Sequence, residues 1–337
     1  MKETISIVLV IIGALVGAGF ASGQEIFSFF FLYGKRGIYG ILIMSILTGF
    51  LIYKSLKIIY QKEIYNYEDF ICLFIKNKKI RKIICTIINM LLLISFFIMI
   101  AGFGAYFEQE IGINKIVGSI ILDILCAIVF FSDIKGVLKA SDFIVPFLII
   151  FIIIIGIQNI VKPEFVDIIE IKNNWIQSAI IYTSYNFILL IPVLISLKKQ
   201  IIAEKNIKYI SLLSVGIIIV LSLIIFFLLA RADIFEIKKQ EMPVVYIISN
   251  YFSNYKKIYA FIILASIFTT AISVGIGFIQ NISKNRDNYP QIILIMCITS
   301  LIVSNFGFSK LVNLVYPIFG YLGILQIITI LFFQNNR

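Results

Sequence analysis

Long apolar segments recur throughout this sequence of 337 residues, and they restrict the folds that it can adopt. Runs such as "LLLISFFIMIAG" and "FLIIFIIIIGI" are too apolar to form the surface of a soluble domain. A helix needs about 20 apolar residues to cross the bilayer, and lipid excludes open sheets. Because 61% of the residues are hydrophobic and only 14% are charged, we expect an all-α polytopic membrane protein without a sizeable soluble domain.

Ten of these segments have the length of a membrane span. They cover residues 4–33, 37–60, 82–107, 114–132, 139–158, 174–197, 207–230, 257–282, 290–307 and 311–334. With the N-terminus inside, 18 of the 29 Lys and Arg residues fall in cytoplasmic segments, as the positive-inside rule expects. We therefore predict a multi-pass protein of the cell membrane, embedded in the lipid bilayer, with both termini in the cytoplasm. The basic residues flank the spans, so nucleic acid is not an expected partner. The sequence leaves the oligomeric state open.

The first span contains a polar, glycine-rich stretch, "GAGFASGQEI", at residues 17–26. Gly17, Gly19 and Gly23 each lower helix propensity by about 1 kcal/mol relative to alanine, so the helix can stop here. Ser22 and Glu25 have the spacing of a capping box, which would start a second helix. The stretch predicts two half-helices joined by unwound backbone near the middle of the bilayer. Such backbone is tolerated at that depth only beside protein or a water-filled cavity.

The sixth span carries a run of polar-capable residues in its middle, namely Tyr182, Thr183, Ser184, Tyr185 and Asn186. Such a run is hard to place against lipid, so we predict an interruption in this span as well. Breaks in helices 1 and 6 of ten are typical of five-plus-five inverted repeats. We expect one transmembrane domain over residues 1–337, with a first five-helix repeat at 4–158 and a second at 174–334.

The "GAGFASGQEI" stretch, at the start of a ten-span chain of this length, resembles the opening of the YkvI-like bacterial membrane proteins. That family is grouped with amino acid permeases in the amino acid–polyamine–organocation superfamily. The resemblance implies a LeuT-type fold and a secondary active transporter that works by alternating access. It implies a small zwitterionic or amine solute, an amino acid first of all, moved together with Na⁺ or H⁺. A ligand-sensing receptor subunit on the same scaffold, which binds without transport, would share these features.

The candidate substrate site combines the first break with the sixth span. Glu25 is the only acid in the interrupted stretch, and an ionisable group inside a span is costly enough to indicate function. Backbone N–H and carbonyl groups freed at a break suit a carboxylate and a sodium ion. Glu25 can equally be a structural cap, and the glycines can serve tight helix packing. The candidate substrate-binding residues are Gly17, Gly19, Ser22, Gly23, Gln24, Glu25, Tyr106, Tyr182, Thr183, Ser184, Tyr185 and Asn186.

A candidate ion site involves the eighth span, where Thr269, Thr270 and Ser273 lie with Ser266 on one helical face. Resemblance to sodium-coupled LeuT-type transporters implies a Na⁺ site made of Gly17, Phe20, Thr269, Thr270 and Ser273. Such hydroxyls also commonly bond to carbonyls of their own helix. If protons drive transport instead, the resemblance points to Lys139, which would replace the sodium ion. Asp123, inside the fourth span, has no assigned partner.

Other chemistry has little support in the sequence. The chain has no histidine, and Cys72, Cys85, Cys126 and Cys297 form no CxxC pair, so a metal cofactor or a disulfide framework is not expected. Neither a P-loop nor a Gly-x-Ser-x-Gly elbow is present, so we do not expect an enzyme.

Two further segments are candidates for gating. Residues 242–254 are too short to span the bilayer, and we expect them to form a lid at the outer surface. In the tenth span, Asn313, Tyr316 and Pro317 are expected to contribute an outer gate.

Overall fold

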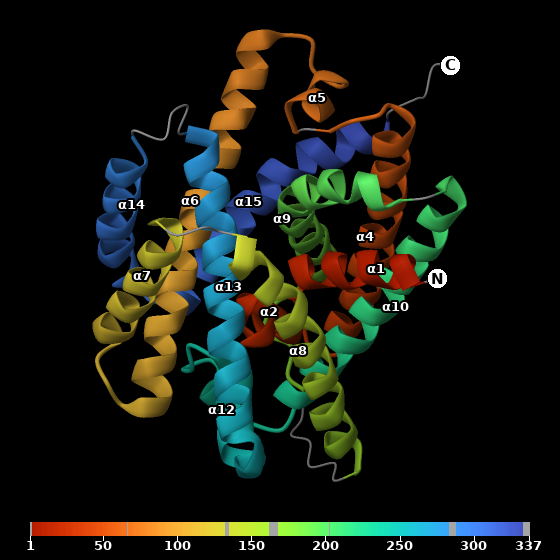
Figure 1. Ribbon diagram of the computed structural model, residues 1–337. Helices are drawn as coiled ribbons and strands as arrows, with labels where there is room; N and C mark the ends of the chain where they lie inside the picture. Colours follow the sequence, from red (N-terminus) through yellow and green to blue (C-terminus); the bar gives the residue numbers. More distant parts are fainter. Residues whose placement is uncertain are drawn as a thin grey trace.

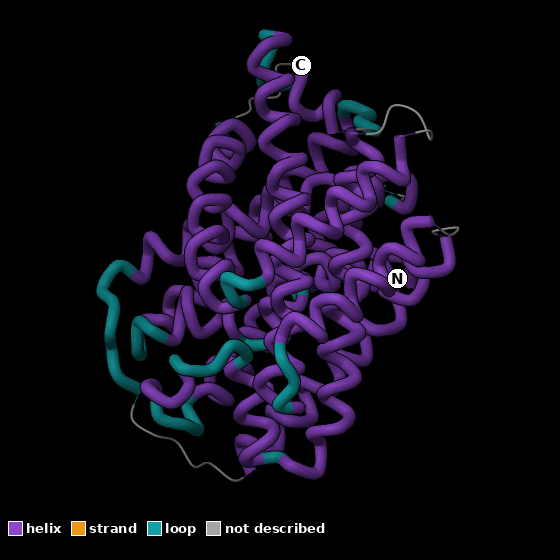
Figure 2. The backbone as a smooth tube through the Cα atoms, turned by 90° about the vertical axis from the view of Figure 1, so that its left-hand side faces the viewer, coloured by secondary structure: helices purple, strands orange, loops and turns teal. Residues whose placement is uncertain are grey.

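The computed structural model describes residues 2–65, 67–131, 135–161, 168–201, 203–282 and 288–332. Within these ranges the regular structure is helical, apart from an isolated antiparallel bridge between Tyr33 and Glu170. Figure 2 shows the result as a bundle of helices joined by short loops. The expectation of an all-α protein is therefore confirmed for the part of the chain that is described.

The long helices are α4 (Arg36–Gln61), α6 (Lys78–Tyr106), α7 (Lys115–Phe131), α8 (Lys135–Val161), α9 (Trp175–Ser196), α10 (Glu204–Leu229), α13 (Lys256–Ile282), α14 (Tyr289–Ser304) and α15 (Phe308–Leu331). The first span is divided into α1 (Lys2–Leu15), α2 (Ala18–Ala21), α3 (Gln24–Ile26) and the π-helical η1 (Phe27–Phe31). The short connecting helices are α5 (Tyr67–Cys72), η2 (Phe107–Ile111), η3 (Leu197–Gln200), α11 (Ile234–Ile237), α12 (Pro243–Tyr251) and η4 (Ser253–Tyr255).

Helical structure coincides with all ten predicted spans. Six helices, α4, α6, α9, α10, α13 and α15, are long and apolar enough to cross a membrane, and residues 3–15, 146–159 and 289–304 form shorter apolar helices. Large apolar side chains point outward from the bundle: Phe261, Leu314 and Leu325 are each at least 67% exposed. Such outward faces fit a lipid surrounding. The chain is thus a polytopic helical membrane protein, and the crossing of all ten segments stays a prediction.

Packing places the first span at the centre. Helix α1 contacts α8, α9 and α10, and Figure 1 shows it running from the N-terminus at one side toward the middle of the molecule, where α2 follows. Helix α9 lies against α4 and α15, while α6 lies against α13. Helices α7 and α14 pair with each other beside α6 at one edge, and α5 and α12 lie at opposite ends of the molecule.

The first span is interrupted where its glycines predict. Helix α1 ends at Leu15, the single turn α2 begins after Gly17, and a second discontinuity follows at Gly23. Gly23 has a φ of +80°, a left-handed conformation that favours glycine because it has no Cβ atom. The chain then continues through α3 into η1, whose π-helical turn is a form often found at functional sites.

The predicted capping box is not present. The Ser22 hydroxyl donates to the Gly19 carbonyl at 3.0 Å and accepts a long bond, 3.4 Å, from the Gln24 N–H. Gly23 takes the N-cap position of α3, and no side chain caps this helix. The Glu25 carboxylate instead turns back toward Gly19 and across to α9. The left-handed glycine makes the turn, so a reciprocal side-chain cap is not needed.

The predicted interruption of the sixth span is wrong, because α9 is continuous from Trp175 to Ser196. The polar side chains in its middle bond within their own helix. Thr183 and Ser184 donate to carbonyls four residues earlier at 2.9 and 2.7 Å, and Asn186 donates to the Tyr182 carbonyl at 3.2 Å. Side chains that are satisfied in this way do not require the helix to open.

Candidate functional site

Glu25 is a buried acid at the interruption of the first span, with 5% of its surface exposed. Its carboxylate lies against the Cα atom of Gly19, in the space that a side chain at position 19 would fill. The Tyr182 hydroxyl of α9 donates to its Oε2 atom at 3.0 Å. The glycine therefore has a specific role, since it makes room for an acid six residues further along the chain.

Aromatic rings from three elements surround this acid, and we call Phe29, Phe30, Tyr182, Tyr185 and Tyr316 the aromatic cluster. Tyr182 packs edge-on against Phe30 and Tyr185, with ring centroids 5.0 and 5.3 Å apart. Tyr185 in turn stacks on Tyr316 of α15 at 4.5 Å. All five residues are at least 95% buried. The cluster holds η1, α9 and α15 together around Glu25.

Two polar atoms near this acid are buried without a partner among the described residues. One is the hydroxyl of Tyr185, which lies near Glu25. The other is the Oε1 atom of Gln24, whose amide nitrogen donates to Ser28 at 3.2 Å and to Ser309 at 2.8 Å. Buried polar groups are nearly always paired in native proteins, so each of these atoms is available to a partner such as a water molecule or a ligand.

The site lies deep within the bundle. Helix α9 has 22 residues, which correspond to a length of about 33 Å, and Tyr185 is its eleventh residue. The Glu25 carboxylate therefore lies near the middle of a helix long enough to cross the hydrocarbon core. No Lys or Arg of the described chain forms an ion pair with it.

Neighbouring elements hold the backbone of the break. The N–H of Val244, in α12, donates to the Ser22 carbonyl at 2.8 Å, and the hydroxyl of Tyr259, in α13, donates to the Ala21 carbonyl. The Val244 side chain packs directly on Gly23. Residues 242–254 were expected to form a lid at the outer surface, and α12 from this segment indeed covers the break, with one face buried.

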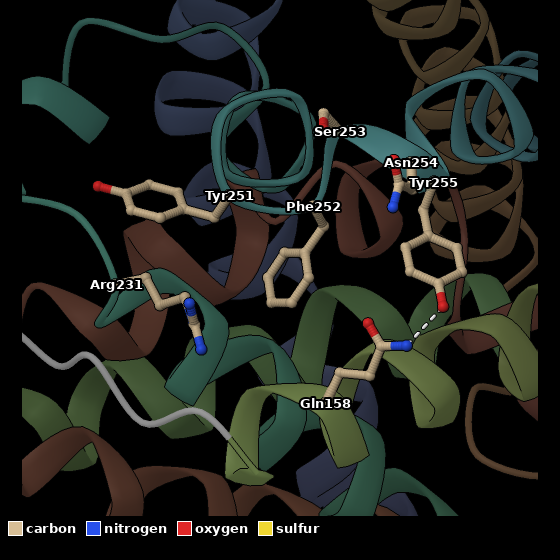
Figure 3. Close-up of a pocket in the computed structure, with 7 residues that line it drawn as sticks. All are labelled: Gln158, Arg231, Tyr251, Phe252, Ser253, Asn254 and Tyr255. Atoms are coloured by element: carbon tan, nitrogen blue, oxygen red, sulfur yellow. Dashed lines mark hydrogen bonds between the residues drawn. The ribbon is translucent and has the colours of Figure 1, made fainter.

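A cavity of about 450 Å³ lies beyond this cover, where α8, α10 and α12 end (Figure 3). It is lined by Gln158, Arg231, Tyr251, Phe252, Ser253, Asn254 and Tyr255. None of the predicted substrate residues lines it. A chain of rings connects it to the break, however, because Phe151 packs against both Tyr255 and Tyr259, at 5.9 and 5.7 Å.

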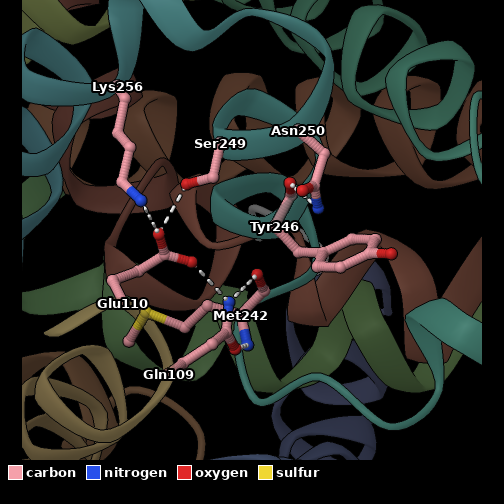
Figure 4. Close-up of polar contacts among 7 residues, drawn as sticks. All are labelled: Gln109, Glu110, Met242, Tyr246, Ser249, Asn250 and Lys256. Atoms are coloured by element: carbon pink, nitrogen blue, oxygen red, sulfur yellow. Dashed lines mark hydrogen bonds and ion pairs between the residues drawn. The ribbon is translucent and has the colours of Figure 1, made fainter. Parts of the chain in front are cut away.

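Helix α12 is fastened to the end of α6 by polar contacts (Figure 4). The amide of Gln109 accepts from the Met242 N–H at 2.9 Å and donates to its carbonyl at 3.2 Å. The Glu110 carboxylate accepts from the Ser249 hydroxyl at 2.5 Å and pairs with Lys256 at 3.1 Å. These contacts fix α12 above the break, and no motif in the sequence indicated them.

The remaining predicted substrate residues are divided between the site and its periphery. Gly19, Glu25, Tyr182 and Tyr185 come together, whereas the hydroxyls of Thr183 and Ser184 bond within α9. Tyr106 is buried at the end of α6, where its ring packs edge-on against Phe107, and no described contact joins it to Glu25.

Tyr316 belongs to the aromatic cluster, and its role in an outer gate stays a prediction. Its neighbour Asn313, also predicted at that gate, is exposed and bonds weakly to Ser309 at 3.4 Å. Sequence analysis also missed Phe29, Tyr259 and Val244 as neighbours of the site. Phe29 could have been predicted as a neighbour of Glu25, because it follows Glu25 by one helical turn.

The predicted ion site brings Gly17 close to the eighth span. A Cβ atom on Gly17 would lie 3.9 Å from the Thr270 hydroxyl, which donates to the Ser266 carbonyl at 2.8 Å. Thr269 and Ser273 likewise donate to carbonyls of their own helix. Hydroxyls bonded in this way keep lone pairs that can bind a cation. No group of three or more Cys, Asp or Glu side chains in the described chain is placed to hold a metal ion.

Asp123 has a structural explanation. It is buried between α7 and α14, where the Ser300 hydroxyl lies 2.7 and 3.0 Å from its two oxygens. This contact joins the two helices at the edge of the bundle, away from Glu25. The side chain of Lys139 lies outside the described residues.

Comparison with known proteins finds two relatives in a bacterium, one of which is named as a membrane protein. The chain is similar to YkvI. That protein of Bacillus subtilis (strain 168), named "Uncharacterized membrane protein YkvI", is 29% identical over 323 residues, which cover 94% of this chain and 91% of YkvI. "Uncharacterized protein YyaD" of the same strain is 26% identical over 329 residues, covering 96% and 95% of the two chains. No protein-family model matches the sequence. The similarity spans nearly the whole length and supports membrane localisation.

Proposed function

We propose that the protein is a secondary active transporter that moves a small amine or zwitterionic solute across the cell membrane. The observation that carries the proposal is Glu25, a buried acid at an interrupted helix, which faces tyrosines from α9 and α15 near the middle of the bundle. An acid at this depth is costly and marks a substrate or ion pathway by default. The proposed role is transport without catalysis, and the sequence offers no ATP-binding motif.

The proposal includes ten membrane spans, with both termini in the cytoplasm, in two repeats at residues 4–158 and 174–334. The contact of the first and sixth spans at Glu25 and Tyr182 supports this pairing, because inverted repeats bring these two helices together at the substrate site. A LeuT-type arrangement with α9 unbroken is the form that we propose.

Coupling to Na⁺ or H⁺ supplies the driving force in the proposal. Gly17 and Thr270 lie next to each other, which supports a sodium site between the break and α13. The site would use the hydroxyl oxygens of Thr269, Thr270 and Ser273 as hard ligands, together with backbone carbonyls of Gly17 and Phe20. If protons drive transport instead, Lys139 would take the place of the sodium ion.

Uptake into liposomes tests the proposal. Purified protein is reconstituted, and accumulation of labelled amino acids and amines is measured under a Na⁺ gradient and a pH gradient imposed separately. We expect accumulation of at least one solute under one gradient, and no accumulation in liposomes without protein. Binding without flux under either gradient would contradict transport and would indicate a ligand-sensing receptor.

The coupling ion is tested in the same assay. If Na⁺ drives uptake, Thr270→Val and Thr269→Ala should raise the sodium concentration required for half-maximal flux. Thr299→Ala is a matched control, because this half-buried threonine also bonds to its own helix but lies in α14. Uptake that follows only the pH gradient would overturn the sodium assignment.

A further inference from the structure

We infer that the site around Glu25 takes the ammonium group of a small apolar amine without a carboxylate, with Glu25 as its counter-ion. The inference rests on the proposed function, since it names the substrate class of the same site. The inferred substrate class is narrower than the one in the proposed function, because it includes amines and excludes amino acids. Three observations carry it: a buried acid without a described basic partner, a buried hydroxyl beside it that makes no well-formed hydrogen bond, and the aromatic side chains of the aromatic cluster.

The charge comes first. Glu25 is 95% buried, and its one described hydrogen bond comes from a neutral phenol, that of Tyr182. The two buried cations in the described chain are engaged elsewhere: Lys198 lies over Tyr65 and near Glu63, and Arg231 lies over Phe252. A buried carboxylate needs an opposite charge or a proton, and no Lys or Arg among the described residues supplies that charge here. A cationic ligand meets that need.

The unpaired hydroxyl of Tyr185 comes second. It is 98% buried and lies beside the Glu25 carboxylate without a well-formed hydrogen bond to it, so a lone pair is free to accept a hydrogen bond. A primary ammonium group carries three N–H donors. One can go to Glu25 and a second to Tyr185, with the third left for the oxygen of Tyr182. An ammonium group thus matches the acceptors that this site presents.

The third observation is that the side chains packed around Glu25 are aromatic. Phe29 of η1, Tyr185 of α9 and Tyr316 of α15 pack on one another beside the acid, with ring centroids 5.8 Å apart for Phe29 and Tyr185 and 4.5 Å apart for Tyr185 and Tyr316. Such rings pack well against an apolar body, and they add a favourable contact with a cation that lies close to them. A small hydrocarbon group attached to the ammonium is therefore the part of the ligand that these rings recognise.

A zwitterionic amino acid fits less well. The backbone of the break at Gly19 already faces a carboxylate, because the Glu25 side chain occupies the space beside it. The carboxylate of an amino acid bound by its ammonium to Glu25 would lie close to this first one. No described Lys or Arg neutralises the pair, so like charges would repel in a site of low polarity. Selection against the carboxylate follows from the same acid that binds the amine.

Binding to the purified full chain in lipid nanodiscs tests the inference. The probes are matched sets that share one body: 3-methylbutylamine, leucine and 4-methylpentanoate, and likewise 2-phenylethylamine, phenylalanine and 3-phenylpropionate. Isothermal titration should show that the amine of at least one set binds about tenfold or more tightly than its amino acid, a difference that corresponds to about 1.4 kcal/mol. The carboxylates should not bind.

Two variants localise the binding. Glu25→Gln should abolish amine binding, with Glu3→Gln, an exposed acid of the same span, as the control. Tyr185→Phe removes a hydroxyl that makes no well-formed hydrogen bond among the described residues, so thermal stability should change little. Amine affinity should nevertheless fall several-fold in Tyr185→Phe. Tyr209→Phe, at an exposed tyrosine, should change neither quantity.

The outcomes separate the two proposals. Leucine or phenylalanine binding at least as tightly as its amine overturns the inference, and uptake of that amino acid would still support the transporter. Failure of both amines to bind at millimolar concentration also overturns it. Amine binding that needs Glu25, but no flux under any gradient, would keep the inference and overturn transport.

Discussion

The first span and α9 both carry polar residues in the middle of an apolar segment, yet only the first span is interrupted. In α9, hydroxyls and an amide bond to carbonyls of the same helix, so its backbone stays helical. In the first span, several carbonyls find partners on other elements: Tyr259 donates to Ala21, Val244 to Ser22 and Ser178 to Phe29. Polarity alone therefore does not open a membrane helix. The interruption needs glycines, and it also needs neighbours that satisfy the released backbone.

The largest expected effect comes from removing the glycine with left-handed backbone. In Gly23→Ala, the left-handed conformation costs about 1–2 kcal/mol, and overlap with Val244 adds about 1–3 kcal/mol. We expect a clearly lower melting temperature in detergent and a smaller folded fraction by size-exclusion chromatography. Gly17→Ala is the matched control, because its φ is −82° and the nearest atom to an added Cβ lies 3.9 Å away. Equal losses in both variants would contradict a specific role for Gly23.

The second effect concerns the close approach of α15 to the unbroken helix. A Cβ atom at Gly320 would lie 2.6 Å from the Ile181 carbonyl of α9 and would overlap its side chain. Overpacking of this kind costs about 1–3 kcal/mol, so Gly320→Ala should lower the melting temperature, though less than Gly23→Ala. Gly216→Ala in α10 should be neutral, because no atom lies within 4 Å of the added Cβ. An unchanged Gly320→Ala variant would mean that the two helices are not held this closely.

The sequence predicted the helical spans well because apolar length is the dominant constraint in a membrane. It also predicted the first interruption, since Gly17, Gly19 and Gly23 act locally on the backbone. It failed for the sixth span because the same polar residues are compatible with two states. Whether Thr183 bonds to its own helix or lines a cavity depends on what packs against α9, and one sequence does not contain that information.

The candidate site shows the same division. Glu25 could be identified from its position alone, because an acid within a span is rarely neutral to function. The sequence could not show whether Ser22 and Glu25 form a capping box, because Ser22 has several competing backbone partners. A left-handed Gly23 also makes the cap unnecessary. Tyr316 lies 131 residues beyond Tyr185, and only packing of α15 on α9 brings their rings together. Contacts of this kind follow from the tertiary fold.

A smaller effect is expected where α9 supports the first span. The Ser178 hydroxyl donates to the carbonyl of Phe29, in the π-helical η1, at 2.7 Å. Ser178→Ala leaves this buried carbonyl without the hydroxyl and should destabilise the protein by about 1–2 kcal/mol. Chemical unfolding followed by intrinsic fluorescence measures the change, and Ser196→Ala, an exposed serine at the end of α9, serves as the control. No loss would indicate that η1 satisfies its own backbone.

The smallest effect should come from Thr183, one of the five polar-capable residues that predicted a break in α9. Thr183 is fully buried, and its hydroxyl donates to the Ala179 carbonyl, which is already part of a continuous helix. Thr183→Val keeps the shape of the side chain and removes only this second bond, so we expect a change below about 1 kcal/mol in stability. Amine binding should also be retained, because the acceptors at the site are Glu25 and Tyr185. A large loss of binding in Thr183→Val, with stability intact, would show that this hydroxyl turns toward the ligand and that α9 opens during transport.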